Sequence, residues 1–250
     1  MKKLMERNAV IHAVVWIAIY VAVVNIGGVV SEAAGIEESA TGVLLILLSL
    51  ILLRYLARNK WIEKFGIKRI SNENFMRSLM YVPLIFLALL QFVNGIRKPI
   101  NPTGILIIFL MMTGVGFLEE LIFRGFLMQA IWKKSGIKRA ILISGIAFGL
   151  GHIVNLFRGY GYLELTTQII AAAAIGIVLA MLAASTGNIV PGILFHIVFN
   201  ISGSISNPAE SSLEMYVLAL MLVTCVIYSL YLVRYLKGNI STKNREDQSA

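Results

Sequence analysis

The chain has 250 residues, of which 58% are hydrophobic and only 14% charged, and its mean hydropathy is +0.82. A soluble domain is nearer half apolar and a quarter charged, so this composition excludes one and indicates an integral membrane protein. The net charge of +9 does not indicate a nucleic-acid partner, because the bases lie in short stretches between apolar runs. The single cysteine, Cys225, excludes an intramolecular disulfide.

Eight apolar segments are long enough, some marginally, to cross a bilayer, which takes about 20 residues. Their apolar positions do not alternate, so we expect an all-α, polytopic membrane protein rather than a barrel. The expected spans are residues 9–30, 41–57, 75–95, 103–131, 140–157, 165–186, 189–206 and 213–235. The first imitates a signal peptide, but it is too long and lacks a cleavage site, so we interpret it as a retained span. Residues 1–250 then form a single membrane domain with a polar, frayed tail at 238–250.

Lysine and arginine mark one side of this predicted bundle. The basic stretches are residues 1–8, 58–73, 133–139 and 234–245, whereas the alternate loops hold few bases and several glutamates. With eight spans, both termini and all basic stretches fall on one side, which the positive-inside rule makes the cytoplasm. We therefore expect a multi-pass protein of the cell membrane. Residues 59–75 predict either an interfacial helix or a solvated basic loop.

Three polar groups interrupt the apolar spans. A charged residue near the bilayer centre costs about 2.5–3.5 kcal/mol, so such residues are candidates for function. The groups are Glu119, Glu120 and Arg124 in one span, Phe148 and His152 in a second, and His196 and Asn200 in a third.

Helical spacing gives each group a geometry. Glu120 and Arg124 are four residues apart and can form an ion pair on one helix face. Glu119 is rotated by about 100° from Glu120, so the two carboxylates can face different neighbours. Counted from the cytoplasmic ends at 1.5 Å per residue, the polar groups of the three spans lie at overlapping depths of roughly 12–21 Å. This agreement predicts one site, within residues 103–206, that opens toward the cytoplasm.

The residue types in this site suit peptide hydrolysis. A carboxylate and an imidazole can deprotonate water and protonate a leaving amine. A second imidazole and an amide can hydrogen-bond the developing oxyanion. Other protease chemistries lack their residues, because the only aspartate is Asp247 and the chain has no H-E-x-x-H and no G-x-S-x-G.

Structural roles are the alternative for each residue. Glu120 with Arg124 would be a self-neutralised ion pair, and Glu119 a protonated carboxyl hydrogen-bonded within the bundle. His152 would be a buried core histidine, while His196 with Asn200 would hold helices together through hydrogen bonds.

The motifs E-E-x-x-x-R, F-x-x-x-H and H-x-x-x-N, in this order on membrane spans, resemble the CPBP family of CAAX proteases and bacteriocin-processing proteins, also called the ABI family. The matching residues are Glu119, Glu120, Arg124, Phe148, His152, His196 and Asn200. The resemblance covers about residues 103–206 and implies an eight-helix intramembrane glutamate endopeptidase.

By this resemblance, Glu119 and His152 activate the attacking water, and His196 and Asn200 form the oxyanion hole. Glu120, with the remaining matched residues, supports the site. The substrate would be a peptide or a membrane-associated protein, as in pheromone or bacteriocin maturation or self-immunity. Members of the family have also been described as metalloproteases, and Glu119, His152 and His196 would then hold zinc. We favour the version that requires no cofactor.

Two other classes of function fit the same residues. A non-proteolytic bacteriocin-immunity or scaffold protein would use the bundle without its chemistry. A proton-coupled transporter would use the glutamate and the histidines as a proton relay.

Overall fold

The structure is a computed structural model that describes residues 1–70, 72–98, 101–207 and 211–249. Side chains are described except at 72–74, 157–158, 211–212 and 237–249. The described part consists of helices joined by turns and short loops, with no β-strand and a single isolated β-bridge between Ile96 and Ser206. The all-α, multi-pass prediction is confirmed.

Long helices make up most of the bundle. They are α2 (Ala9–Ala33), α3 (Ser39–Arg58), α6 (Pro102–Glu119), α8 (Ile137–Gly151), α9 (Tyr162–Thr186), α10 (Val190–Ile205) and α11 (Ser211–Ser249). Shorter helices join or extend them: α1 (Lys2–Arg7), α4 (Asn72–Ser78), α5 (Ile85–Leu90), α7 (Gln129–Ser135), the 3-10 helices η1 (Glu63–Phe65), η2 (Leu79–Leu84), η3 (Gln91–Asn94) and η5 (His152–Arg158), and the π-helix η4 (Glu120–Met128).

Local signals in the sequence explain several helix ends. The side chain of Asn8 accepts a hydrogen bond from the Ile11 backbone N–H at the start of α2, and Asn101 does the same for Gly104 at the start of α6. Gly187 takes a left-handed conformation and ends α9, and Pro191 stands in the first turn of α10.

Among the described residues, seven helical segments are long and apolar enough to cross a membrane, one fewer than expected. The segment expected to span at 189–206 forms α10, which has 16 residues. At 1.5 Å per residue it is about 24 Å long, shorter than a hydrocarbon core of about 30 Å. The turn that ends α9 and the β-bridge at Ser206 limit α10 at its two ends.

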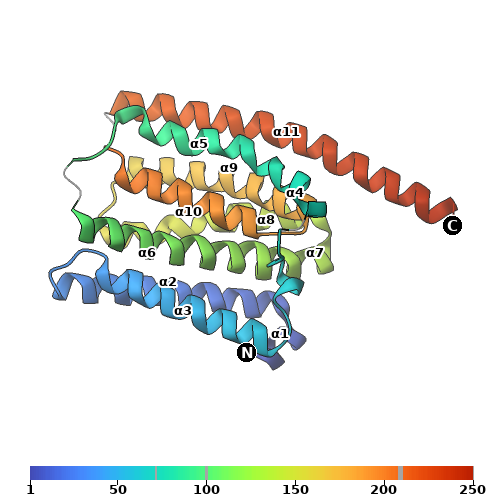
Figure 1. The fold of residues 1–250 in the computed structure, drawn as a ribbon, viewed down its shortest axis with the longest axis horizontal. Helices are drawn as coiled ribbons and strands as arrows, with labels where there is room; N and C mark the ends of the chain where they lie inside the picture. The colour runs from blue at the N-terminus through green and yellow to red at the C-terminus, as the bar shows by residue number, and fades with distance from the viewer. Residues whose placement is uncertain (71, 99–100, 208–210, 250) are drawn as a thin grey trace.

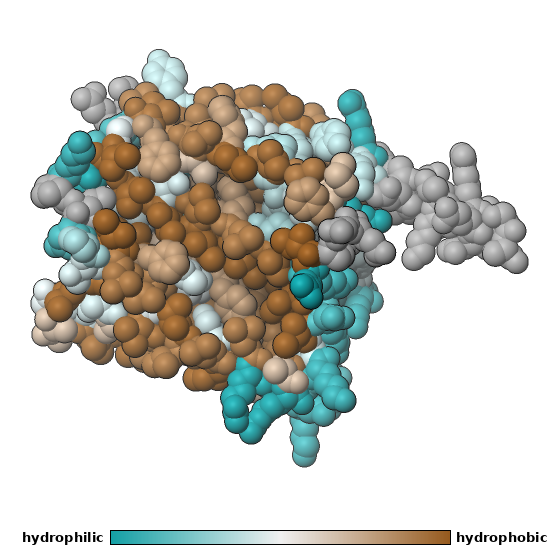
Figure 2. Space-filling view, viewed as in Figure 1, coloured by the Kyte–Doolittle hydropathy of each residue, from teal (hydrophilic) through white to brown (hydrophobic). Residues whose placement is uncertain are grey.

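The helices run roughly parallel or antiparallel along one axis, so the bundle has two ends (Figure 1). The side surface between them is broadly hydrophobic, whereas hydrophilic residues gather at both ends (Figure 2). We call the end with α1, η1 and α7 the basic end; it carries Lys3, Lys64, Lys68, Lys133 and Lys138. We call the other the acidic end; it carries Glu32, Glu37, Glu38, Glu164 and Glu214, together with Arg97 and Lys98.

Close helix contacts at glycine hold the centre of the bundle together. A Cβ built at Gly145 would lie 2.7 Å from the Ile177 nitrogen, and one at Gly149 would lie 2.8 Å from the Ile169 carbonyl oxygen. These two glycines form the G-x-x-x-G of α8, and they let its backbone touch that of α9. Gly116 brings α6 to Ile197 of α10 in the same way.

The segment at 59–75 packs into the basic end instead of forming an interfacial helix or a purely solvated loop. Phe65 is 1% exposed and makes an edge contact with Phe126, with ring centroids 4.7 Å apart. The carbonyl of Gly66 accepts a hydrogen bond from the Ile189 N–H. His12 is buried nearby and hydrogen-bonds Tyr55. Phe65 therefore belongs to the core and Trp61, Ile62 and Ile67 pack against it, whereas Ile70 and Phe75 are exposed.

α11 continues through the segment expected to be a frayed tail. It is helical to Ser249 and projects beyond the rest of the bundle at the basic end (Figure 1). The side chains of residues 237–249, and residue 250 as a whole, lie outside the described part.

Candidate active site

The first polar motif lies where α6 changes into a π-helix. Glu119 is the last residue of α6, and Glu120 begins the nine-residue η4, all of which is buried. π-helical turns are rare and are frequent at functional sites. From the sequence, a regular α-helix was expected here. The change in helix type falls between the two carboxylates, and they face different surroundings.

Glu120 lies in the interior within an ion pair. Its Oε1 is 2.8 Å from Arg124 Nη1, and the two side chains are 1% and 0% exposed. Arg124 also donates a hydrogen bond to the Gly176 carbonyl at 3.1 Å. A Cβ at Gly192 would stand 3.3 Å from Glu120 Oε2, so this glycine leaves room for the carboxylate. The ion pair predicted from the i,i+4 spacing is present.

Glu119 faces a cavity and is held from two sides. The Tyr20 hydroxyl donates a hydrogen bond of 2.7 Å to Oε1, and His196 Nε2 lies 3.4 Å from Oε2. The imidazole that contacts this carboxylate is therefore that of His196, whereas the resemblance paired Glu119 with His152. Both histidines come from helices that cross the bundle at the same level, and depth alone does not tell which ring turns toward Glu119.

His196 bridges the two carboxylates. Its Nδ1 is 3.1 Å from Glu120 Oε1, while its Nε2 faces Glu119. A neutral imidazole carries only one N–H, so a doubly protonated ring would satisfy both contacts. Glu119, Glu120, Arg124 and His196 would then carry no net charge, which reduces the cost of burying them.

His152 is oriented by its own helix. It is the C-cap of α8 and the first residue of η5, and its Nδ1 lies 3.1 Å from the Phe148 carbonyl oxygen. A carbonyl only accepts hydrogen bonds, so the proton of the neutral ring belongs on Nδ1. Nε2 is then the unprotonated nitrogen, which can accept a proton.

Phe148 lies at the centre of the polar groups. Its ring makes edge contacts with His152 and His196, at centroid distances of 5.3 and 5.5 Å. The guanidinium of Arg124 lies 4.4 Å from the ring centroid, a cation–π contact. The aromatic ring thereby fixes the spacing of three of the predicted site residues.

Two adjoining cavities, of about 420 and 440 Å³, bring the candidate residues together. Glu119 lines the first cavity and His196 the second, while His152 and Asn200 line both. The four candidate catalytic residues, from three segments of the chain, therefore share one connected space. Glu120 and Arg124 line neither cavity, which fits the supporting role predicted for them.

Tyr20 and Gln168 belong to the site, although neither was predicted to do so from the sequence. Tyr20 is 99 residues from Glu119 and carries no motif that points to a site. Gln168 lines both cavities and accepts a hydrogen bond of 2.9 Å from Asn155. Its polar side chain in an apolar helix is a signal that the sequence carries, although no site role was predicted for it.

Residues 101–202 match the family described as type II CAAX prenyl endopeptidase Rce1-like. Comparison with curated proteins and with solved structures finds no match. The family match agrees with the resemblance given by the three motifs, all of which lie inside it, whereas Tyr20 lies outside. This is a multi-pass membrane protein, and its residues 101–202 are similar to an Rce1-like CAAX protease. At the level of the family, this match supports an intramembrane endopeptidase.

The donor geometry bears on the zinc alternative. Within the described residues, no group of three or more His, Cys, Asp or Glu side chains is arranged to hold a metal ion. Glu119 and His196 do approach each other, but each is already engaged, with Tyr20 and Glu120 respectively. These residues fit a hydrogen-bonded proton network better than a zinc site.

Proposed function

We propose that the protein is an endopeptidase of the cell membrane that cuts a peptide or a membrane-associated protein within this connected space. The proposal rests mainly on one observation, that Glu119, His152 and Asn200 line the same cavity. A water molecule and a peptide bond placed there would meet a carboxylate, an imidazole and an amide together.

In the proposed reaction, Glu119 takes a proton from water as the oxygen attacks the carbonyl carbon of the peptide bond. Tyr20 holds the carboxylate in place for this step. The oxyanion that forms accepts hydrogen bonds from the Asn200 amide and from His196, once Nε2 turns from Glu119. When the carbon–nitrogen bond breaks, the leaving amine receives a proton from Glu119 or through His152 Nε2.

The buried ion pair of Glu120 and Arg124 supports this chemistry without lining the cavities. Glu120 Oε1 contacts Nδ1 of His196 and so holds the ring in place. The other ring nitrogen, Nε2, then faces Glu119 and the cavity. Arg124 in turn neutralises Glu120. None of these steps requires a metal, and we expect cleavage by the purified protein to be unchanged by a chelator.

The first test compares membrane peptides in cells that produce the wild-type chain or a variant. New N-termini should appear with the wild type and be absent with Glu119→Gln and with His152→Ala. Glu63→Gln, a matched change at an exposed residue of the basic end, should give the wild-type set. The purified proteins are then assayed on one of the peptides found.

Full activity of Glu119→Gln or His152→Ala on that peptide would refute the proposed mechanism. If neither substitution changes the set of new N-termini, and cells that produce the variants keep a protective phenotype, the immunity or scaffold function is supported instead. A substrate-dependent pH change in sealed vesicles would favour the transporter.

A further inference from the structure

Both cavities extend from the candidate catalytic residues toward the acidic end. Along α6, the lining residues Met111 and Val115 precede Glu119, on the side of the helix start. Along α10, Ser204 follows Asn200 toward the helix end. Glu164 and Glu214, near the starts of α9 and α11, are exposed and line the second cavity. On α6 and α10 these lining residues lie nearer the acidic end than Glu119 and Asn200 do, and Glu164 and Glu214 lie at the acidic end itself.

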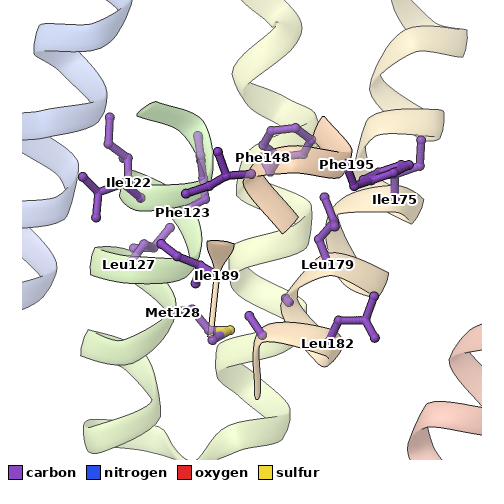
Figure 3. Close-up of a cluster of buried hydrophobic side chains, with 14 of the residues drawn as sticks. Ile122, Phe123, Leu127, Met128, Phe148, Ile175, Leu179, Leu182, Ile189 and Phe195 are labelled. Carbon is purple, nitrogen blue, oxygen red and sulfur yellow. The ribbon is translucent and has the colours of Figure 1, made fainter. Parts of the chain in front are cut away.

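The other side of the site is closed by packed side chains. Toward the basic end, η4, α9 and the start of α10 contribute apolar residues that fill the interior (Figure 3). Leu127, Met128, Leu179, Leu182 and Ile189 are each at most 4% exposed. Protein interiors are packed as densely as organic crystals, so a peptide would have to displace this layer to pass through it.

Polar contacts strengthen the closed side. The Asn188 side chain donates a hydrogen bond to the Lys68 carbonyl at 3.1 Å and accepts one from the Val190 N–H at 3.0 Å. The Tyr81 hydroxyl donates to the Asn188 carbonyl at 3.3 Å. These hydrogen bonds connect the turn between α9 and α10 to the segment that follows α3, on the basic-end side of the site.

Charge orients the bundle in the membrane. The basic stretches at 1–8, 58–73 and 133–139 share one end, which the positive-inside rule places in the cytoplasm. The acidic end, where the cavities lead, then lies on the opposite side.

We infer that the site is reached from the non-cytoplasmic side of the membrane, so that its substrates are extracytoplasmic peptides or extracytoplasmic segments of membrane proteins. Agreement in depth had suggested a cytoplasmic opening, but the packed layer lies on that side. That these molecules are substrates rests on the proposed endopeptidase function. The direction of access rests on the cavities and the charges alone. The first cavity is walled largely by apolar residues such as Ile17, Met112 and Phe123, which suits an apolar peptide segment.

Two serines provide a matched test of access. Ser204 lies near the acidic end, lines the first cavity and donates a hydrogen bond of 2.8 Å to the Asn200 carbonyl. Ser185 lies near the basic end and makes the same kind of bond, also 2.8 Å, to the Met181 carbonyl. Each is changed singly to cysteine in a Cys225→Ser background, which removes the only native thiol. Lys138→Cys, at an exposed position of the basic end, reports orientation.

Intact cells producing the full chain are treated with a membrane-impermeant maleimide, before and after permeabilisation. We expect Ser204→Cys to be modified in intact cells and Lys138→Cys only after permeabilisation. Ser185→Cys should stay unmodified in intact cells. Modification of Lys138→Cys in intact cells, or of Ser204→Cys only after permeabilisation, would overturn the inference.

A second measurement separates access from chemistry. The purified protein is reconstituted in vesicles, its orientation is determined from labelling of Lys138→Cys, and a cleavable peptide is supplied on one side. We expect cleavage only from the side opposite Lys138. Cleavage only from the Lys138 side would refute the inference and leave the endopeptidase function standing. Labelling as expected with no cleavage from either side would refute the function and leave the direction of access standing.

Discussion

A single hydroxyl group determines how Glu119 is presented to the cavity. The Tyr20 hydroxyl is 2.7 Å from Oε1, which leaves Oε2 on the side of His196. A hydrogen bond to a charged group contributes about 1.5–3 kcal/mol. Removal of this bond frees the carboxylate to rotate, and a base must be positioned accurately to work efficiently.

We therefore expect Tyr20→Phe to lower kcat about tenfold, which corresponds to about 1.4 kcal/mol, and to leave KM near the wild-type value. The phenyl ring still forms the cavity wall, so binding of the peptide should change little. Steady-state kinetics on a peptide substrate measure this split. Tyr231→Phe is the control, because that ring is 55% exposed and stacks on Tyr228. A wild-type kcat in Tyr20→Phe would show that the hydrogen bond has no part in catalysis.

The sequence was sufficient for contacts within one helix and insufficient for contacts between helices. Glu120 and Arg124 lie on one helix face, so their ion pair followed from spacing alone. The partners of Glu119 lie on α2 and α10, and their approach depends on how those helices rotate and pack. A shared depth placed His152 and His196 in the same site, but it carries no information on rotation.

At the scale of the elements, glycines decide how closely the helices of the site approach. α8 carries Phe148 and is capped by His152, and it touches α9 at Gly145 and Gly149 without intervening side chains. The G-x-x-x-G spacing, visible in the sequence, is typical of such close helix contacts. The π-helix η4 was not predicted, because the apolar pattern of residues 120–128 does not distinguish a π-helix from an α-helix.

Gly145→Ala should destabilise the bundle by about 1–3 kcal/mol, the usual cost of overpacking a core. The new Cβ would lie 2.7 Å from the backbone nitrogen of Ile177, so α8 and α9 must move apart. Alanine is a better helix former than glycine by about 1 kcal/mol, so a loss of stability would report the packing alone. Thermal unfolding in detergent measures the change in Tm.

The matched control is Gly161→Ala, at the start of α9, where an added Cβ meets no atom within 4 Å. Its φ of −66° is accessible to alanine, so Tm should be unchanged. An equal or higher Tm for Gly145→Ala would show that α8 and α9 tolerate separation.

At the scale of the whole molecule, the site extends beyond the part that matches the family. The match covers residues 101–202, yet Tyr20 of α2 holds Glu119, and Val217 and Met221 of α11 line the second cavity. Composition and charge were sufficient to predict a multi-pass helical bundle and its two ends. They were insufficient for the direction in which the site opens, since that depends on where Leu179, Leu182 and their neighbours fill the interior.

α11 shows which part of the chain the bundle needs. Met221, Cys225 and Leu232 are at most 7% exposed, so the first part of this helix belongs to the core, whereas its end projects beyond the bundle (Figure 1).

A chain that stops after Lys237 should keep the wild-type Tm and cleavage rate. A chain that stops before Ser211 should lose both, because it lacks one wall of the second cavity and leaves apolar surface of α9 unpaired. Purified yield, thermal unfolding and peptide cleavage are measured for both. Loss of activity in the shorter deletion would assign residues 238–250 a part in function, and full activity in the longer one would exclude the second cavity from the site.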